Sequence, residues 1–404
     1  MRARDILRDP KNRNLFSVLL YVALMLAVFL VTHAIFSYFG FLHTDVDTAR
    51  ILLNTLVNSE AGIFAIVVTL SLIAVQLAAT SYSARVIDLF MRTPDPWVLM
   101  VIYIAAMVYG LWTLKLVDRE CISGMELHIS LCFYMGTFAF LALILFIWNT
   151  FGLLQPFAII DRLSERITGQ HILLLLNRDN PFNIDPVQPI IDIVLGSWGR
   201  YDYGTLGYGL RAVSNRASAL MTVELESPQD RALVADHILA HFFRMGSLAL
   251  NRKDEDFAWN ILANLNFIGV VATEQRLEST VLSILKFLGN LGITASEAKL
   301  QRIAFEAAGY LRQMGEEAAE SQLKDASKTS AYYLAEVGIV AAEHGLEDPA
   351  AFAATGLEEL RAKAARHRLY AMAQQCELSL NDVRAALRNE RIAADVSQRQ
   401  QKGR

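Results

Sequence analysis

The sequence is poor in cysteine and in charged residues, and each shortage narrows the class of protein. Its three cysteines lie far apart without paired spacing, which excludes a disulfide framework and a cysteine-bound zinc site. Charged residues make up 19% of the 404 residues and the net charge is −4, so the chain lacks the concentrated basic face of a nucleic-acid binder. Hydrophobic residues reach 54%, which predicts that part of the chain lies in lipid.

Motifs that carry common enzyme chemistry are also missing. The sequence contains no P-loop, no H-E-x-x-H and no G-x-S-x-G. His237 and His241 lie one helical turn apart in DHILAH, but they would hold a metal only with a third ligand from elsewhere in the chain. Two histidines on a helix are more often ordinary packing or surface residues. We therefore predict no enzyme activity, no metal site and no cofactor.

Four stretches without Asp, Glu, Lys or Arg are long enough to cross a bilayer core, which takes about 20 apolar residues. They are Leu15 to Gly40, Ala61 to Tyr82, Trp97 to Leu114 and His128 to Leu154. Basic residues are concentrated in the N-terminal segment, residues 1–14, and in the turn between the second and third stretches. The opposite loops mix basic with acidic residues, so both termini are expected in the cytoplasm. The sequence thus predicts a four-span transmembrane domain over residues 15–156, with the lipid bilayer as its first partner.

The second span differs from the others in its polar residues. At about 100° per residue, six small or polar side chains fall within about 40° of one line along the helix: Gly62, Ala65, Thr69, Gln76, Thr80 and Ser83. In lipid, such a stripe is expected to face protein or water. One interpretation is close packing and hydrogen bonding between helices. The other is a water-filled pore lined by Thr69, Gln76, Thr80 and Ser83, with Arg85 at its cytoplasmic mouth.

The same region resembles a known family. The run LVNSEAGIFAIVVTLSLIAVQLAATSYSARVIDLF, followed by IYIAAMVYGLWTL, is similar to the core of a family of bacterial and archaeal predicted membrane proteins of uncharacterised function. In that family a long apolar helix with a late glutamine precedes a Ser-Pro-Arg turn. Here the turn is Ser83, Ala84 and Arg85, so its proline is missing. The resemblance implies a multi-pass protein of the prokaryotic inner membrane and no catalytic residue.

Proline marks the junction that follows the spans. Three prolines cluster in NRDNPFNIDPVQP, and this cluster is the best domain boundary. We therefore predict a connecting helix and linker over residues 157–186. Only two prolines follow, Pro228 after Ser227 and Pro349 after Asp348, and both fit the N-cap and N1 arrangement of a helix start. Residues 187–393 are thus predicted to be helical, and residues 394–404 to form a disordered tail.

Glycine recurs in this helical region with a period of 23 residues. The column is Gly246, Gly269, Gly292, Gly315 and Gly338, and a leucine column follows at Leu277, Leu300, Leu323 and Leu346. Such self-similarity marks a repeat architecture. A unit of 23 residues holds one helix of about 18–20 residues and a tight turn. Breaks are expected after the leucines, with Gly345 at a C′ position. A glycine on the packing face lets a neighbouring helix approach closely.

The predicted fold class is all-α: a four-helix transmembrane domain followed by a cytoplasmic, solenoid-like domain of 23-residue single-helix units. The function we expect is a homo-oligomeric channel or pore-like assembly, with the solenoid as an assembly or gating domain. The alternative is a membrane-anchored solenoid scaffold that recruits a soluble cytoplasmic protein and transports nothing. A nucleic-acid partner is not expected.

Overall fold

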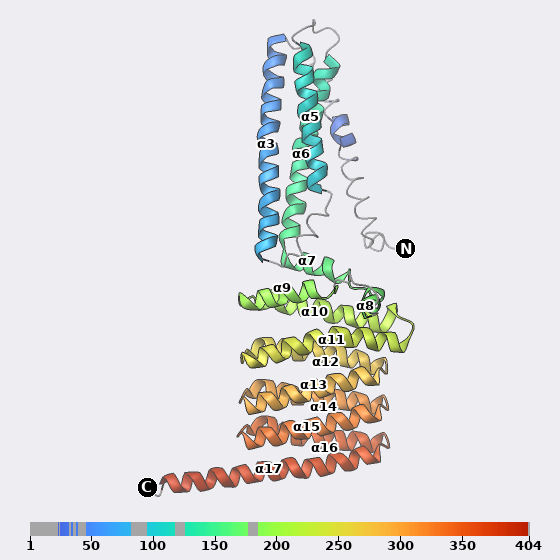
Figure 1. Cartoon of the computed structure of the whole chain (residues 1–404), viewed down its shortest axis with the longest axis vertical. Helices are drawn as coiled ribbons and strands as arrows, with labels where there is room; N and C mark the ends of the chain where they lie inside the picture. The colour runs from blue at the N-terminus through green and yellow to red at the C-terminus, as the bar shows by residue number, and fades with distance from the viewer. Residues whose placement is uncertain are drawn as a thin grey trace. The chain divides into compact units, whose positions relative to one another are not determined.

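The computed structural model describes residues 23, 25–31, 34, 38, 46–81, 95–117, 126–176 and 185–402. Within these residues all regular structure is helical, as the sequence predicts. Contacts divide the chain into two compact units, Met1–Ala158 and Ile159–Arg404 (Figure 1).

Three long apolar helices form the described part of the first unit: α3 (Val46–Ser81), α5 (Asp95–Val117) and α6 (Glu126–Leu154). Each contains a stretch long and apolar enough to cross a membrane, namely Val46–Ile73, Trp97–Val117 and Leu127–Ile147. The helices pack pairwise against one another (Figure 1). Their shared core includes Leu99 and Tyr103 from α5 and Phe146 from α6, all buried.

Two of the predicted spans differ from the structure or lie partly outside it. Of the first span, Leu15–Gly40, the structure describes a helical stretch over residues 25–31, where Val28 packs into the core of the other helices. The second span begins earlier than predicted, since α3 starts at Val46 rather than at Ala61. The segment before Ala61 has no proline or glycine to end a helix, and its Leu53 is fully buried.

The second unit opens with short helices. They are α7 (Pro156–Ser164), which crosses the division between the units, α8 (Gly169–Leu176), α9 (Gln188–Gly199), α10 (Tyr203–Ala219) and the π-helical turn η1 (Leu220–Glu224). Ile160, Ile167 and Ile172 are fully buried. Much of the segment that the sequence assigned to a connection, residues 157–186, is therefore core of the second unit.

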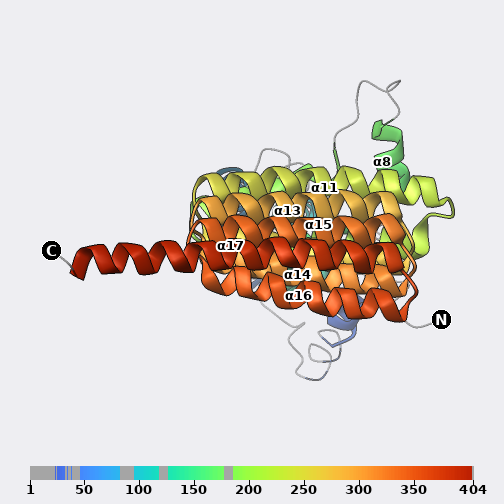
Figure 2. The same ribbon diagram turned by 90° about the horizontal axis from the view of Figure 1, so that it is seen from below.

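Longer helices follow: α11 (Pro228–Asn251), α12 (Glu255–Glu274), α13 (Glu278–Glu297), α14 (Gln301–Glu320), α15 (Lys324–Glu343), α16 (Glu347–Arg366) and α17 (Tyr370–Lys402). Helices α12 to α16 are 20 residues long and start 23 residues apart. Each helix packs against the next one and against the second one along the chain. The odd-numbered helices therefore stack in one layer and the even-numbered helices in another (Figure 2).

The turns between these helices repeat one geometry. A residue with positive φ ends each helix, at Lys253, Arg276, Lys299, Gln322, Gly345 and Arg368. The next residue donates its N–H back to an alanine carbonyl five residues nearer the N-terminus, as Leu346 does to Ala341 at 2.8 Å. This is the Schellman motif. Gly345 thus occupies the predicted C′ position, and helices α13 to α16 begin directly after the leucine column.

The two predicted proline starts have different outcomes. Ser227 caps α11, with its side chain accepting from the Asp230 N–H, and Pro228 is the first helical residue, as predicted. Helix α16 instead begins at Glu347 after Leu346, so Asp348 is not its N-cap. Pro349 fits inside the first turn because N–H groups there have no helical acceptor.

The glycine column lies where each helix meets the following two. A Cβ built on Gly315 in α14 would lie 2.9 Å from Cβ of Ser330 in α15 and 3.0 Å from Cδ2 of Leu360 in α16. Side chains of the next two helices lie within 4 Å in the same way at Gly246, Gly269, Gly292 and Gly338. The absence of a side chain therefore sets the spacing both within a layer and between the layers.

The C-terminal segment is helical rather than disordered. Helix α17 continues through the predicted tail, residues 394–404, as far as Lys402. The segment is rich in Ala, Arg and Gln, which favour helix even without burial.

Candidate functional site

The stripe predicted on the second span lies on a surface of α3 that the other described helices leave exposed. Gly62, Thr69 and Gln76 are exposed, and no atom lies within 4 Å of a Cβ built on Gly62. The Thr69 hydroxyl donates to the carbonyl of Ala65, one turn back, at 2.8 Å. A hydroxyl satisfied within its own helix tolerates lipid, protein or water. At Gly62 and Thr69 this surface can therefore face lipid, a further helix or water.

The rest of the stripe cannot be followed to its end. Thr80 lies within α3 and Ser83 and Arg85 follow it, but the side chain of Thr80 and both later residues are outside the described part of the chain. The exposed side of α3 also carries purely apolar residues, such as Leu72 at 56% exposure. The exposed surface of α3 thus combines polar residues with apolar residues that suit lipid.

The first unit buries a carboxyl group that the sequence analysis missed. Glu60 is 1% exposed, and its Oε2 has no hydrogen-bond partner among the described residues. It lies within the apolar stretch Val46–Ile73 of α3. A Cβ built on Gly136 of α6 would lie 2.9 Å from its Oε1, so this glycine makes room for the carboxyl group.

Glu60 and the stripe occupy opposite sides of the same helix. Thr69 follows Glu60 by nine residues, which is about 180° around a helix of 3.6 residues per turn. Glu60 therefore faces the interior of the three-helix unit while the stripe faces outward. Ionisable residues inside a membrane-spanning segment are costly, and they usually mark functional sites. The sequence signal was present, since Glu60 is the only charged residue between Arg50 and Arg85, but placing the span's start at Ala61 removed it from the membrane.

Other polar groups between α5 and α6 are paired. The Tyr103 hydroxyl donates to the carbonyl of Ala139 at 3.1 Å. The Tyr109 hydroxyl and His128 Nδ1 are 2.8 Å apart, and Cys132 is hydrogen-bonded to Thr113. These bonds hold the two helices together.

The second unit brings a third side chain to the predicted histidine pair. His237 and His241 lie on α11, and Asp185 lies before α9. The Asp185 Oδ2 is 3.2 Å from Nε2 of His237 and 2.8 Å from Nε2 of His241. Its Oδ1 accepts the N–H of Val187 at 2.9 Å. Burial alone would raise the pKa of Asp185, but the two nearby histidines, of which His241 is hydrogen-bonded to it, and the Val187 N–H hold that pKa well below its usual range.

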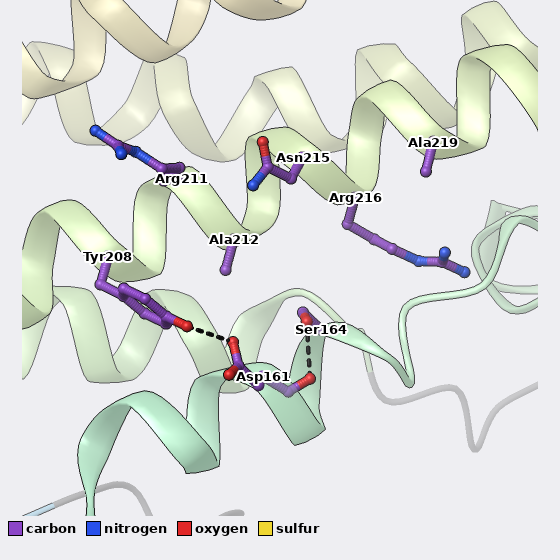
Figure 3. A pocket seen from close by; sticks show the side chains of 8 residues that line it. All are labelled: Asp161, Ser164, Tyr208, Arg211, Ala212, Asn215, Arg216 and Ala219. Carbon is purple, nitrogen blue, oxygen red and sulfur yellow. Dashed lines mark hydrogen bonds between the residues drawn. The ribbon is translucent and has the colours of Figure 1, made fainter. Parts of the chain in front are cut away.

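A cavity of about 250 Å³ lies between α7 and α10, and side chains with polar groups, such as Asp161, Tyr208 and Arg216, are among those that line it (Figure 3). The Tyr208 hydroxyl donates to Oδ1 of Asp161 at 2.8 Å, and this hydrogen bond raises the pKa of Tyr208. Arg211 and Arg216 point away from each other, and Arg216 donates to the carbonyl of Ile167 (Figure 3). Tyr208 and Arg216 are thus hydrogen-bonded to protein groups. The residues that line the cavity do not combine a nucleophile with a base.

These features define a membrane protein with apolar spanning helices and a helical repeat domain. Residues 11–188 match the family described as "Predicted membrane protein (DUF2254)". The match covers the three described spans and reaches the start of α9, beyond the core region in which the sequence resemblance was seen.

Two further comparisons add no functional assignment. A search of curated proteins finds no match. One solved structure, titled "Circular tandem repeat protein with novel repeat topology and enhanced subunit contact surfaces", aligns over 96% of this chain and 98% of its own, with 13% sequence identity and a TM-score of 0.43.

Proposed function

We propose that this protein is a homo-oligomeric channel or pore-like assembly of the prokaryotic inner membrane. It has four spans, both termini lie in the cytoplasm, and its domain of 23-residue single-helix units serves as an assembly or gating domain. The observation that supports the proposal is the polar stripe of α3, which neither α5 nor α6 covers at Gly62, Thr69 and Gln76. A ring of such helices would place hydroxyl and amide groups around an aqueous path. No catalytic role is part of this proposal.

The test is ion flux from the full-length protein in liposomes, together with its mass in detergent. Thr69→Val removes a hydroxyl from the stripe, and Val68→Thr places the same hydroxyl on another side of α3 as a matched control. We expect conductance from the wild type, a changed conductance in Thr69→Val and in Gln76→Leu, and no change in Val68→Thr. A monomeric protein without conductance would exclude the channel.

A scaffold is the second candidate, and one row of side chains favours it. Trp259, Phe305 and Phe352 follow one another along the even-numbered layer, and the Phe305 and Phe352 rings are 4.6 Å apart. Arg302 lies over the ring of Trp259 and Arg312 over that of Phe352. Aromatic and arginine side chains are enriched at protein interfaces.

The scaffold and the channel predict opposite mutant behaviour. If the repeat domain recruits a soluble protein, Phe305→Ser should abolish co-purification of that protein from native membranes, while Gln76→Leu should leave it intact. Tyr332→Ser is the matched control, because Tyr332 is an exposed aromatic residue on the odd-numbered layer. Loss of the partner in the Tyr332 variant, with retention in the Phe305 variant, would refute this surface.

A further inference from the structure

The cluster of Asp185, His237 and His241 has the composition and spacing of a metal site. Three potential ligand atoms, one from each residue, lie within 4.8 Å of one another. The two measured separations from the Asp185 oxygen, 3.2 and 2.8 Å, are close to the distances between neighbouring ligands when metal–ligand bonds are about 2.1 Å long. The three side chains are between 14% and 21% exposed, so the cluster is sheltered but reachable from solvent.

The backbone brings the two histidines to one point. Residues at i and i+4 of a helix are neighbours on the same face, and the two rings on α11 lie 5.5 Å apart at an angle of 84°. Both Nε2 atoms approach the same carboxylate oxygen, which comes from a residue 52 positions before His237. The arrangement thus combines a rigid pair with a third group from a distant part of the chain.

We propose that Asp185, His237 and His241 bind a first-row divalent transition metal ion of the Zn²⁺ type. Two imidazoles and one carboxylate suit zinc, cobalt or nickel, whereas calcium and magnesium prefer shells made of oxygen alone. Three protein ligands in a partly exposed site leave a position for water or another ligand.

A backbone hydrogen bond orients the Asp185 carboxylate for metal binding. The Val187 N–H holds Oδ1, which leaves Oδ2 directed at the two histidines. Such hydrogen bonds from outside the metal shell orient a ligand and usually contribute 10- to 100-fold to metal affinity.

A bound metal would join two parts of the second unit. Asp185 lies immediately before α9, whereas the histidines lie on α11 at the start of the odd-numbered layer. Metal binding would therefore fix the entry to α9 against the stack and add stability by mass action, because the unfolded chain lacks the assembled site.

The experiment measures zinc and cobalt binding to the full-length protein in detergent, purified through a tag without histidine and treated with a chelator. We expect one Zn²⁺ per chain by calorimetry and a visible absorption band with Co²⁺, which reports the ligand geometry in the wild type directly. His237→Ala and His241→Ala should each weaken Zn²⁺ binding by at least tenfold, and zinc should raise the Tm of the wild type but not of these variants.

Controls separate this site from adventitious binding and from misfolding. His344→Ala removes a histidine from the end of α15 and should bind zinc as the wild type does. Each variant must elute as the wild type does in gel filtration and keep its helical circular dichroism. If the wild type binds no metal at micromolar concentration, or if the two histidine variants bind as well as His344→Ala, the cluster is only an ion pair and the proposal is wrong.

Discussion

Replacing Gly315 by alanine tests whether the glycine column sets the spacing of the helices. The control is Gly309→Ala in the same helix, α14. A Cβ at position 309 would find its nearest neighbour, Phe352, at 3.9 Å, which is ordinary contact. A Cβ at position 315 would overlap Oγ of Ser330 and lie 2.9 Å from its Cβ.

Both variants gain helix propensity, but only Gly315→Ala overpacks the contact between helices. Each gains about 1 kcal/mol of helix propensity, because both glycines are inside a helix. Only Gly315→Ala adds the cost of overpacking, about 1–3 kcal/mol. Ser330 cannot withdraw cheaply, since it is fully buried and its hydroxyl donates to the carbonyl of Leu311 at 2.6 Å. Gly309→Ala should therefore be the more stable variant by about 1–3 kcal/mol.

Hydrogen exchange of the full-length protein, followed by mass spectrometry, measures this difference in peptides of α14 and α15. Gly315→Ala should lose protection in both helices, and Gly309→Ala should gain it. A second substitution, Ser330→Gly, removes both close atoms, so it should cost less in the Gly315→Ala background than in the wild type. Equal protection in the two alanine variants, or purely additive effects of Gly315→Ala and Ser330→Gly, would refute the close approach.

Three further predictions follow from the turns, the membrane helices and the charged cluster. Gln322→Gly should stabilise the repeat domain by about 1 kcal/mol and Gly345→Gln should destabilise it by a similar amount, because both positions have positive φ; thermal unfolding measures both. Gly136→Leu should drive α6 away from Glu60 and reduce the yield of folded protein in gel filtration, whereas Glu60→Gln should preserve both the fold and the yield, because it keeps the shape without a charge. In metal-free buffer, Asp185→Asn should be less stable than the wild type at about pH 5 and above. The difference should begin to shrink as the pH falls below about 4, where an unfolded aspartate takes up its proton, and should go on shrinking towards the lowered pKa of the folded group. A difference in the free energy of unfolding that stays constant between about pH 5 and about pH 2 in denaturant titrations would contradict this.

Regular spacing made much of the repeat domain predictable. A column that recurs every 23 residues reports which positions share an environment, so the leucines before the helix starts and the turn at Gly345 could be placed without a structure. The other turns have no glycine at the corresponding position, so nothing in the sequence indicated their positive φ. Arg276, Lys299 and Gln322 adopt the conformation of Gly345, yet their residue types do not favour it. Packing of the adjacent helices holds these residues there.

The groups that the sequence analysis missed depend on contacts between distant segments. Asp185 belongs to a stretch rich in proline and asparagine, and only the fold brings it to His237 and His241. Glu60 was missed for a different reason. A charged residue normally ends a predicted span, but Gly136 on α6 leaves room for its side chain inside the first unit. The sequence contains Glu60 and Asp185 themselves, but the contacts that give them their environment appear only in the folded chain.

The contacts of each repeat helix with its first and second successors give the array a parity. Because layers alternate helix by helix, loss of one 23-residue unit would transfer every later helix to the opposite layer and exchange the surfaces that the two layers present. Loss or gain of 46 residues would leave every later helix in its own layer. The number of helices in such a domain can therefore change in steps of two without moving any later helix. A change of one helix would exchange the layers of all the helices that follow it.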